Sequence, residues 1–451
     1  MHLARVSPRQ LKQKKPKDYI KTSVLVLIAF SSTFFSRVFD TLGAPATVNF
    51  LHFVTVPFAC TVALTKTRTK DRHQIFIAWA MIYGLLLLLA VMLASALLND
   101  AAFINVVLEF MLLGEPFLFL LAIVSTPMSP DSFNQLRNWI CSFCLFHLAL
   151  VFVQKYVLRL DRSRALAGAD LLQGVFYFSG AGHVVGASIS LTFGLYYLIS
   201  AKKVPLVLRS AIFLATCWQV IIADAKQVIL VFFVAGLLLL LTKFKDIVEA
   251  IKYLLCLVIA VYTLLWCMAN VPAFDAFNTW ANVDLYGPEG DATLLKTASF
   301  RIITSYYESP LNWVLGLGPG HTVGRLGGWM LKIYRDLLAP FGPTIHPASG
   351  DSWRAVGASW LGSKSSMFSP LFGWAGIWGD LGFLGLAAYL FLATIVWHYI
   401  CLDDFSRFLL LTVFVFGLIF TQMEEPSYML FISTILGVRW QQHQNKASRS
   451  R

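Results

Sequence analysis

The sequence predicts an all-α integral membrane protein, and three observations support this prediction. Of 451 residues, 57% are hydrophobic and 13% are charged, and the mean hydropathy is +0.68. Soluble proteins average about 45–50% apolar and about 25% charged residues. The apolar residues form runs long enough to cross a bilayer as helices, and lysine and arginine gather between alternate runs. This composition excludes an ordinary soluble enzyme, a disordered protein and a collagen-like fibre.

Roughly twelve runs qualify as transmembrane helices, because a helix needs about 20 apolar residues to cross the hydrocarbon core. Residues 1–271 hold the first nine spans and a basic N-terminus, 272–365 form one large external loop, and 366–451 hold the remaining spans and a basic tail. A further apolar stretch, 366–379, is short and fits a re-entrant or interfacial piece. The predicted spans are 21–39, 45–64, 75–97, 102–125, 138–157, 184–200, 204–223, 227–242, 249–271, 381–400, 405–421 and 426–439.

The distribution of lysine and arginine predicts that both termini are cytoplasmic. The head, the loop at 66–72, the turns at 202–203 and 243–245, and the tail are basic, and they share one side if the number of spans is even. No small-residue cleavage site follows the head, so the first span is expected to stay uncleaved. We assign the net charge of +12 to this anchoring and expect no nucleic-acid partner, because no folded polar domain carries a basic patch.

The seven cysteines indicate no disulfide framework, metal site or cofactor. All lie inside or at the edge of apolar runs, where cysteine acts as a small packing residue. Cys141 and Cys144 form a CxxC, but neither a second pair nor clustered histidines accompany it.

The predicted external face carries cations that break the positive-inside pattern. Long loops cross the membrane regardless of charge, but cations in short turns beside spans call for a reason, and an anionic ligand supplies one. For Lys226, which follows Asp224 at the outer end of a span, a plain interfacial anchor is the alternative. The cations are Arg159, Arg162, Arg164, Lys226, Arg301, Arg325, Lys332, Arg335, Arg354 and Lys364.

Two glycine-containing motifs stand out. Gly316, Gly318 and Gly320 alternate within GLGPG, which permits positive φ angles and a close approach of backbone N–H groups to a ligand, although any tight turn can use such glycines. Asp380 opens DLGFLG at the outer start of a span. The glycines of that motif suit close helix packing, whereas a carboxylate at a membrane boundary needs a partner.

Acidic residues within the apolar sequence form a further group. Glu109 and Glu115 lie inside a predicted span, where they could pair with Arg37, line a lipid groove or serve a proton-coupled transporter. Glu424 and Glu425 precede Pro426 in a short external turn and are expected to be solvated.

Together the motifs resemble the O-antigen ligase and polymerase superfamily, the integral-membrane glycosyltransferases of bacterial envelopes. The matching positions are Lys226, Arg301, Pro310 with the GLGPG turn, and DLGFLG at 380–385. The resemblance covers roughly 180–400 in its motifs and the whole chain in its topology. It implies a GT-C-like fold in the bacterial inner membrane.

The resemblance further implies a transferase that works without metal or cofactor. The donor would be a glycan on undecaprenyl pyrophosphate, the acceptor a sugar hydroxyl on a second lipid-linked unit, and a chain-length regulator a further partner. Fixed cations would stabilise the departing pyrophosphate: Arg301 first, Lys226 second, and Arg159, Arg162 and Arg164 third. His321 is the first candidate for the general base, with Asp380 as a further catalytic candidate and His346, Asp351, Glu308 and His183 as alternatives.

Three functions stay open at this point. Ligases of the superfamily usually carry a histidine about ten residues before the final Gly-x-x-Gly, and that position falls near Leu371 and Phe372 here. Its absence favours a polymerase of repeat units over a ligase. A transporter or flippase of lipid-linked oligosaccharide is the third hypothesis, although the sequence does not show the two related halves that are typical of transporters.

Overall fold

The computed structural model confirms that the chain is helical. It describes residues 21–66, 71–126, 128–162, 168–179, 181–243, 247–271, 274–281 and 283–449, and these ranges contain no β-strand. The described residues contain seven helical segments that are long and apolar enough to cross a membrane. The number of twelve spans and their orientation stay predictions. The seven segments are Ala46–Lys66, Arg72–Leu98, Phe103–Ser125, Pro130–Val157, Gly182–Ser200, Ile251–Asn270 and Ser366–Ile400.

The helices follow one another with short connections. The longer ones are α1 (Thr22–Phe34), α3 (His52–Lys66), α4 (Arg72–Leu98), α5 (Phe103–Ser125), α6 (Pro130–Phe152), α7 (Gly182–Ser200), α8 (Leu206–Ile222), α9 (Lys226–Leu241), α10 (Ile247–Asn270), α17 (Pro347–Ala358), α19 (Gly373–Ile395), α20 (Asp404–Ile419) and α21 (Pro426–Arg449). The shorter α-helices are α2 (Ser36–Thr41), α11 (Asp275–Trp280), α12 (Asp291–Lys296), α13 (Ala298–Ser305), α14 (Leu311–Leu315), α15 (Leu331–Ile333), α16 (Arg335–Leu338) and α18 (Trp360–Lys364). Single turns of helix are η1 (Ala46–Phe50), η2 (Val153–Val157), η3 (Leu160–Arg162), η4 (Gly168–Leu171), η5 (Gly174–Phe176), η7 (Val283–Tyr286), η8 (Leu326–Met330), η9 (Ala339–Phe341), η10 (Ser366–Phe368), η11 (Val396–Ile400) and η12 (Thr421–Glu424).

Polar caps fix where several helices begin. Ser129 accepts the N–H of Ser132 at 3.2 Å before α6, and Asp403 accepts the N–H of Ser406 at 2.9 Å before α20. The first turn of a helix leaves N–H groups without intrahelical partners, and a side-chain oxygen at the cap satisfies one of them. These caps therefore set the points at which the chain enters the apolar bundle.

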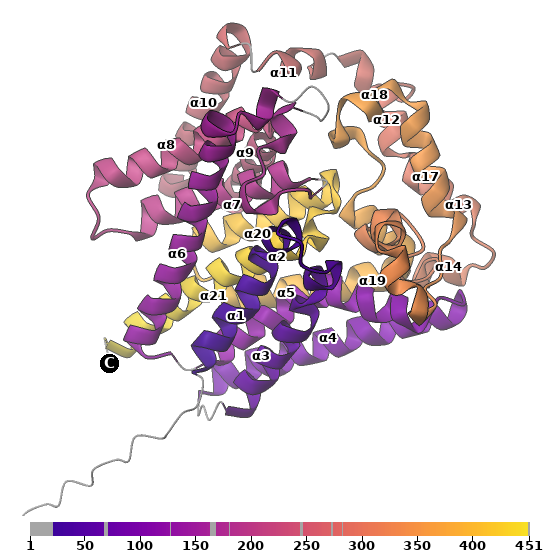
Figure 1. Cartoon of the computed structure of the whole chain (residues 1–451), viewed down its shortest axis with the longest axis horizontal. Helices are drawn as coiled ribbons and strands as arrows, with labels where there is room; N and C mark the ends of the chain where they lie inside the picture. Colours follow the sequence, from indigo (N-terminus) through magenta and orange to yellow (C-terminus); the bar gives the residue numbers. More distant parts are fainter. Residues whose placement is uncertain are drawn as a thin grey trace, which may run out of the picture.

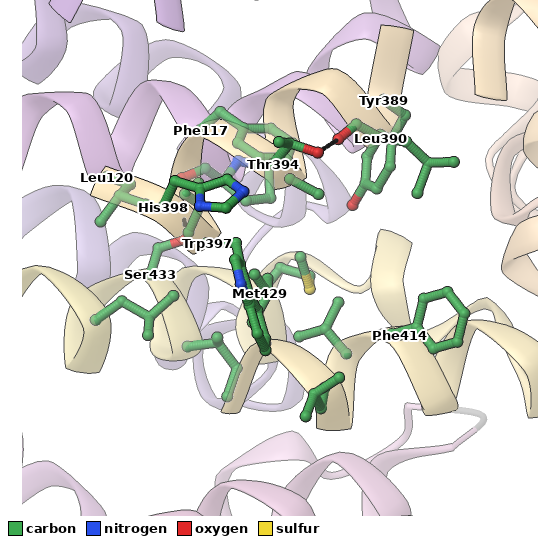
Figure 2. Close-up of a pocket in the computed structure, with 18 of the residues that line it drawn as sticks. Phe117, Leu120, Tyr389, Leu390, Thr394, Trp397, His398, Phe414, Met429 and Ser433 are labelled. Carbon is green, nitrogen blue, oxygen red and sulfur yellow. Dashed lines mark hydrogen bonds between the residues drawn. The ribbon is translucent and has the colours of Figure 1, made fainter. Parts of the chain in front are cut away.

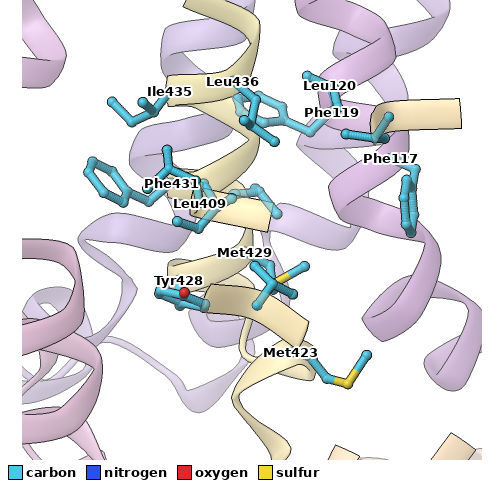
Figure 3. Close-up of a cluster of buried hydrophobic side chains, with 14 of the residues drawn as sticks. Phe117, Phe119, Leu120, Leu409, Met423, Tyr428, Met429, Phe431, Ile435 and Leu436 are labelled. Carbon is cyan, nitrogen blue, oxygen red and sulfur yellow. The ribbon is translucent and has the colours of Figure 1, made fainter. Parts of the chain in front are cut away.

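Helices α5 and α21 form the centre of the bundle. Helix α5 packs against α3, α4 and α21, and most of its residues are buried. Figure 3 shows Phe119 of α5 close to Leu436 of α21, with Leu409 of α20 and Phe431 of α21 completing the cluster. Inside a membrane such contacts stabilise through close van der Waals packing, because lipid is as apolar as the side chains.

The segment from α11 to α18 lies to one side of the bundle (Figure 1). It corresponds to the predicted external loop, and it is folded into short helices. α14 attaches it to the bundle by packing against α4 and α19. The loop is thus docked onto the ends of the spanning helices, where it forms the candidate site.

Helix α19 differs from its prediction. It begins at Gly373, eight residues before the predicted span at 381, so half of the stretch at 366–379 belongs to this helix instead of forming a separate re-entrant piece. The helix is broken at Gly382, whose φ is 64° and ψ −164°. Only glycine adopts such angles readily.

Candidate functional site

The break in α19 creates the docking point for the GLGPG turn. A helical carbonyl normally accepts the N–H four residues later, so a break at Gly382 frees the carbonyls of Gly379 and Asp380. The N–H of Leu317 donates to Gly379 at 2.8 Å, and the N–H of Gly318 donates to Asp380 at 3.0 Å. Buried carbonyls need such partners. The turn therefore continues the hydrogen bonding that the helix gives up.

All three glycines of the turn have positive φ, as their spacing predicted: 73° at Gly316, 108° at Gly318 and 70° at Gly320. Gly316 lies so close to Asp380 that a Cβ would overlap the backbone there. The backbone of the turn therefore does approach a partner closely, but that partner is the backbone of α19 and not a ligand. The expectation that these N–H groups face a ligand is therefore corrected for Leu317 and Gly318, which bond α19.

Asp380 occupies the place that the sequence suggested for an anionic ligand. Its Oδ1 accepts the N–H of Thr322 at 2.7 Å, and the N–H groups of Gly320 and His321 also face this carboxyl group. Successive N–H groups in a tight turn form a concave anion site. Here that site holds the side chain of the chain's own aspartate, so Asp380 positions the turn.

Two further carboxyl groups approach Asp380 around Gly324. A Cβ at Gly324 would lie 3.2 Å from Oε2 of Glu424 and 3.4 Å from Oδ2 of Asp380, and Glu109 of α5 interacts electrostatically with both acids. All three side chains are at most 1% exposed. Each keeps one buried oxygen without a hydrogen-bond partner. Buried carboxyl oxygens without hydrogen-bond partners are costly, so these three acids form an energetically unfavourable polar cluster inside the bundle.

The expectation that Glu424 and Glu425 are solvated is wrong. Glu424 accepts the backbone N–H of Arg325 at 2.5 Å, and Glu425, with 13% of its side chain exposed, forms an ion pair with the Arg325 guanidinium. Burial raises the pKa of Glu424 to about 8, and nearby Asp380 adds to the effect. The turn η12 thus points both acids into the protein, toward the segment that follows the glycine turn.

Arg325 also faces a small polar cavity of about 40 Å³. Arg37 lines the same cavity and is held by Asp40, whose Oδ2 lies 3.3 Å from Nη1 of Arg37 and accepts Asn49 at 3.0 Å. Each arginine uses only some of its five donors, and Nε of Arg325 is buried without a partner. Two guanidinium groups in fixed orientation therefore retain donors for an anion.

His52 also lines this cavity, and a buried glutamate holds its ring. His52 at the start of α3 has its Nδ1 2.8 Å from both carboxylate oxygens of Glu115 in α5, and the exposed fractions of their side chains are 5% and 1%. A carboxylate at Nδ1 fixes the ring and leaves Nε2 as the atom that can accept a proton. Glu115 therefore pairs with His52, whereas Arg37 pairs with Asp40.

His321 is engaged on both sides of its ring. Nδ1 donates to the carbonyl of Leu317 at 2.7 Å, and Nε2 lies 2.8 Å from Oγ1 of Thr344. The residue is 4% exposed, and burial lowers its pKa. In this arrangement neither ring nitrogen is open to a substrate hydroxyl. The geometry therefore favours a positioning role for His321 and not the role of general base.

The predicted cations do not gather. Nη1 of Arg301 donates to Thr297 and its Nη2 to the carbonyl of Leu294, both at 2.7 Å and both close in sequence. Lys226 pairs with Asp224 at 2.5 Å. α13 and α9, which carry these cations, lie apart in Figure 1.

The loop arginines are equally remote from the cavity. Arg159 and Arg162 are exposed, and neither lines the cavity of Arg37 and Arg325. Arg164 lies outside the described residues. Of the ten cations assigned to the external face, Arg325 is the one among the described residues that lines this cavity.

An apolar cavity of about 240 Å³ lies between α5, α19, α20 and α21. Figure 2 shows its lining, with Phe117 and Tyr389 on one side and Phe414 and Met429 on the other. Trp374, near the start of α19, also lines it. The lining carries no Asp, Glu, Lys or Arg, which suits a hydrocarbon chain.

Sequence reasoning missed His52, Glu424 and the pairing of Arg37. One overlooked signal is the three-residue spacing of Gly376, Gly379 and Gly382, which marks the face on which the loop docks. A Cβ at Gly376 would lie 2.5 Å from Cα of Gly324. Among the described residues, no group of three His, Cys, Asp or Glu side chains is arranged to hold a metal.

Comparisons with known proteins add no relative: neither a protein-family model nor a curated protein matches this chain.

Proposed function

We propose that this protein is a bacterial inner-membrane glycosyltransferase that polymerises glycan repeat units carried on a polyprenyl diphosphate, working at its external face. The supporting observation is the cavity lined by Arg37, Arg325 and His52, whose ring is held by Glu115. It combines donors for an anion with a candidate base at the membrane boundary. The proposal keeps twelve spans with both termini cytoplasmic, and it rests on the motif resemblance as well as on this cavity.

The reaction assigns one task to each group. The bond between the anomeric carbon of the donor glycan and the diphosphate breaks, and both of its electrons leave with the diphosphate. Arg37 and Arg325 stabilise that growing charge as fixed donors. The acceptor hydroxyl bonds the anomeric carbon and passes its proton to Nε2 of His52, which Glu115 holds in place. The products are the lengthened lipid-linked glycan and a free polyprenyl diphosphate.

The two cavities fit the two ends of such a substrate. The polar cavity, about 40 Å³, is large enough for ordered water, which phosphate oxygens can replace. The sugar would then lie outside it, toward the segment from α11 to α18. The apolar cavity of about 240 Å³ suits part of an isoprenoid chain.

A second candidate function is proton-coupled transport of a lipid-linked oligosaccharide. The observation that favours it is the cluster of Glu109, Asp380 and Glu424, since buried acids within membrane proteins often relay protons. As a transferase, the protein would use this cluster to position Arg325. The two functions predict different results when the protein is inactivated. Loss of a transporter leaves lipid-linked units in the cytoplasmic leaflet, whereas loss of a polymerase leaves single units that still reach the final acceptor.

The experiment compares Arg325→Ala with wild type in a strain that lacks the gene. We expect the variant protein to remain in the membrane while long glycan chains fall by about 100-fold or more, as when a donor to a developing anion is removed. Single repeat units should still reach the final acceptor. The readouts are a gel of glycan chain length and an immunoblot of membrane fractions.

Arg325→Lys and Arg301→Ala are the matched comparisons. Lysine keeps the charge but loses the bidentate fork, so we expect most activity to be lost, whereas Arg301→Ala should keep long chains. Loss of chains in Arg301→Ala with retention in Arg325→Ala would contradict the assignment to this cavity. Complete loss of glycan from the acceptor would identify a ligase, and accumulation of lipid-linked units in the cytoplasmic leaflet would identify a transporter.

A further inference from the structure

A large cleft opens at the opposite end of the bundle from the candidate site. It has a volume of about 950 Å³ and lies between α6, the turn after α7 and the C-terminal half of α21. Helix α5 gives its distance from the GLGPG turn: Asn105 near the start of α5 donates to the carbonyl of Pro319, and Ile123 near its end accepts Gln441 of α21. Eighteen helical residues separate these contacts, about 27 Å.

Four cations line this cleft, and one of them is already neutralised. Arg439 of α21 binds Asp403 through Nε at 3.0 Å and through Nη2 at 2.8 Å, and it also donates to Ser200. Nε2 of His443 lies 2.9 Å from the same Asp403 oxygen. Asp403 therefore pairs with Arg439 and His443 and does not pair with the other cations of the cleft.

The other three cations lack such partners. Arg137 of α6 lies over the ring of Phe133 in its own helix at 5.9 Å, and Lys202 and Lys203 project from the turn after α7. Within the described part of the chain, none of the three forms an ion pair. Asp131 lines the neighbouring hollow on α6, which shares Asn134 and Asn138 with the cleft.

The rest of the lining has two kinds of surface. Side-chain amides of Asn134 and Asn138 supply further hydrogen-bond donors, whereas Phe133, Leu145, Ile199 and Val204 supply apolar surface. A cationic and amide-rich end beside an apolar end matches a lipid whose headgroup bears a phosphate. Basic pockets between transmembrane helices on the cytoplasmic side are known to bind such headgroups.

We propose that this cleft binds the phosphate of an anionic phospholipid from the leaflet on the basic side of the membrane. Arg137, Lys202 and Lys203 hold the headgroup, and the apolar residues contact the first acyl carbons. Because the cleft shares no lining residue with the arginine cavity or the apolar cavity, the ligand is separate from the lipid-linked substrate of the proposed reaction. The inference stands whether or not that reaction is correct.

The test measures lipid binding to the purified full-length protein in detergent by native mass spectrometry. Phosphatidylglycerol is titrated against wild type and against the triple variant Arg137→Gln/Lys202→Gln/Lys203→Gln. We expect one tightly bound phosphatidylglycerol on wild type and at least tenfold weaker binding to the variant. Lys332→Gln/Arg335→Gln/Lys364→Gln removes the same charge at the other end of the molecule and should bind as wild type does.

Two further experiments use the wild-type protein alone and test whether the cleft recognises an anionic lipid or free phosphate. Phosphatidylcholine, which has no net charge, should bind at least tenfold more weakly, and 10-fold more salt should weaken phosphatidylglycerol binding by screening. Inorganic phosphate should not displace the lipid. Equal binding of phosphatidylcholine, displacement by inorganic phosphate, or an unchanged triple variant would each overturn the proposal.

Discussion

At the scale of single residues, the site is decided by which charged groups are buried together. Arg325 and Glu424 illustrate this. From the sequence, Arg325 was one of ten cations on the predicted external face, and Glu424 was one of two acids in a short turn. Burial and pairing depend on how η12 folds against the segment after the glycine turn, and that contact spans 99 residues of sequence. Residue types alone could not predict it. Positive φ at the GLGPG glycines could be predicted, because local spacing is enough.

The first prediction at this scale concerns pH. Burial raises the pKa of Glu424 from 4.5 to about 8, with Asp380 raising it further and Arg325 opposing. A raised carboxyl pKa means that the folded state holds a proton that the unfolded state has released, so the contribution to stability is complete below pH 4.5 and is lost as pH rises toward 8. The loss amounts to a few kcal/mol in order of magnitude.

Glu424→Gln removes this titration while keeping an oxygen that can accept the Arg325 N–H. We expect the variant to melt at a higher temperature than wild type at pH 9, with the gap shrinking at pH 5. Thermal unfolding of both proteins in detergent at pH 5, 7 and 9 measures it. A gap that stays constant across this range would show that Glu424 is not the group responsible.

At the scale of elements, a broken helix organises the site. The sequence predicted this span only from residue 381, because the apolar stretch at 366–379 is too short to cross a membrane by itself. In the structure residues 373–379 are helical and join the span, and the break at Gly382 comes later. The reason is tertiary: the break becomes favourable once the GLGPG turn bonds the freed carbonyls of Gly379 and Asp380.

Gly382→Ala tests this arrangement. At the Gly382 angles, φ 64° and ψ −164°, alanine is strained by about 1–3 kcal/mol, and its Cβ would overlap the carbonyl of Val314 in α14. We expect α14 and the glycine turn to detach from α19, giving a lower melting temperature and faster proteolysis between α11 and α18.

Gly236→Ala in α9 is the control for that variant. A Cβ there meets nothing within 4 Å, and its φ is not positive. It should therefore melt within a degree or two of wild type. Equal melting temperatures and equal proteolysis for the two variants would contradict the docking argument.

At the scale of the whole molecule, the two ends of α5 separate two kinds of chemistry. The end near Asn105 contacts the GLGPG turn, and the end near Ile123 contacts the C-terminal half of α21, which lines the basic cleft. Composition was enough to predict an all-helical membrane protein. Composition was not enough to predict the number of spans. Helices α1, α8 and α9 are apolar but have only 13, 17 and 16 residues, and these lengths are near or below the length that crosses a bilayer unaided.

The orientation of the molecule gives the last prediction. Basic turns stay on the cytoplasmic side, so the turn that carries Lys203 should face the cytoplasm and the segment that carries Lys332 should face outward. Both side chains are exposed. In a cysteine-free background, Lys332→Cys should react with a membrane-impermeant maleimide in intact cells, and Lys203→Cys only after the inner membrane is permeabilised. Labelling in the reverse order would place the arginine cavity on the cytoplasmic side, where a donor delivered to the outer leaflet could not reach it.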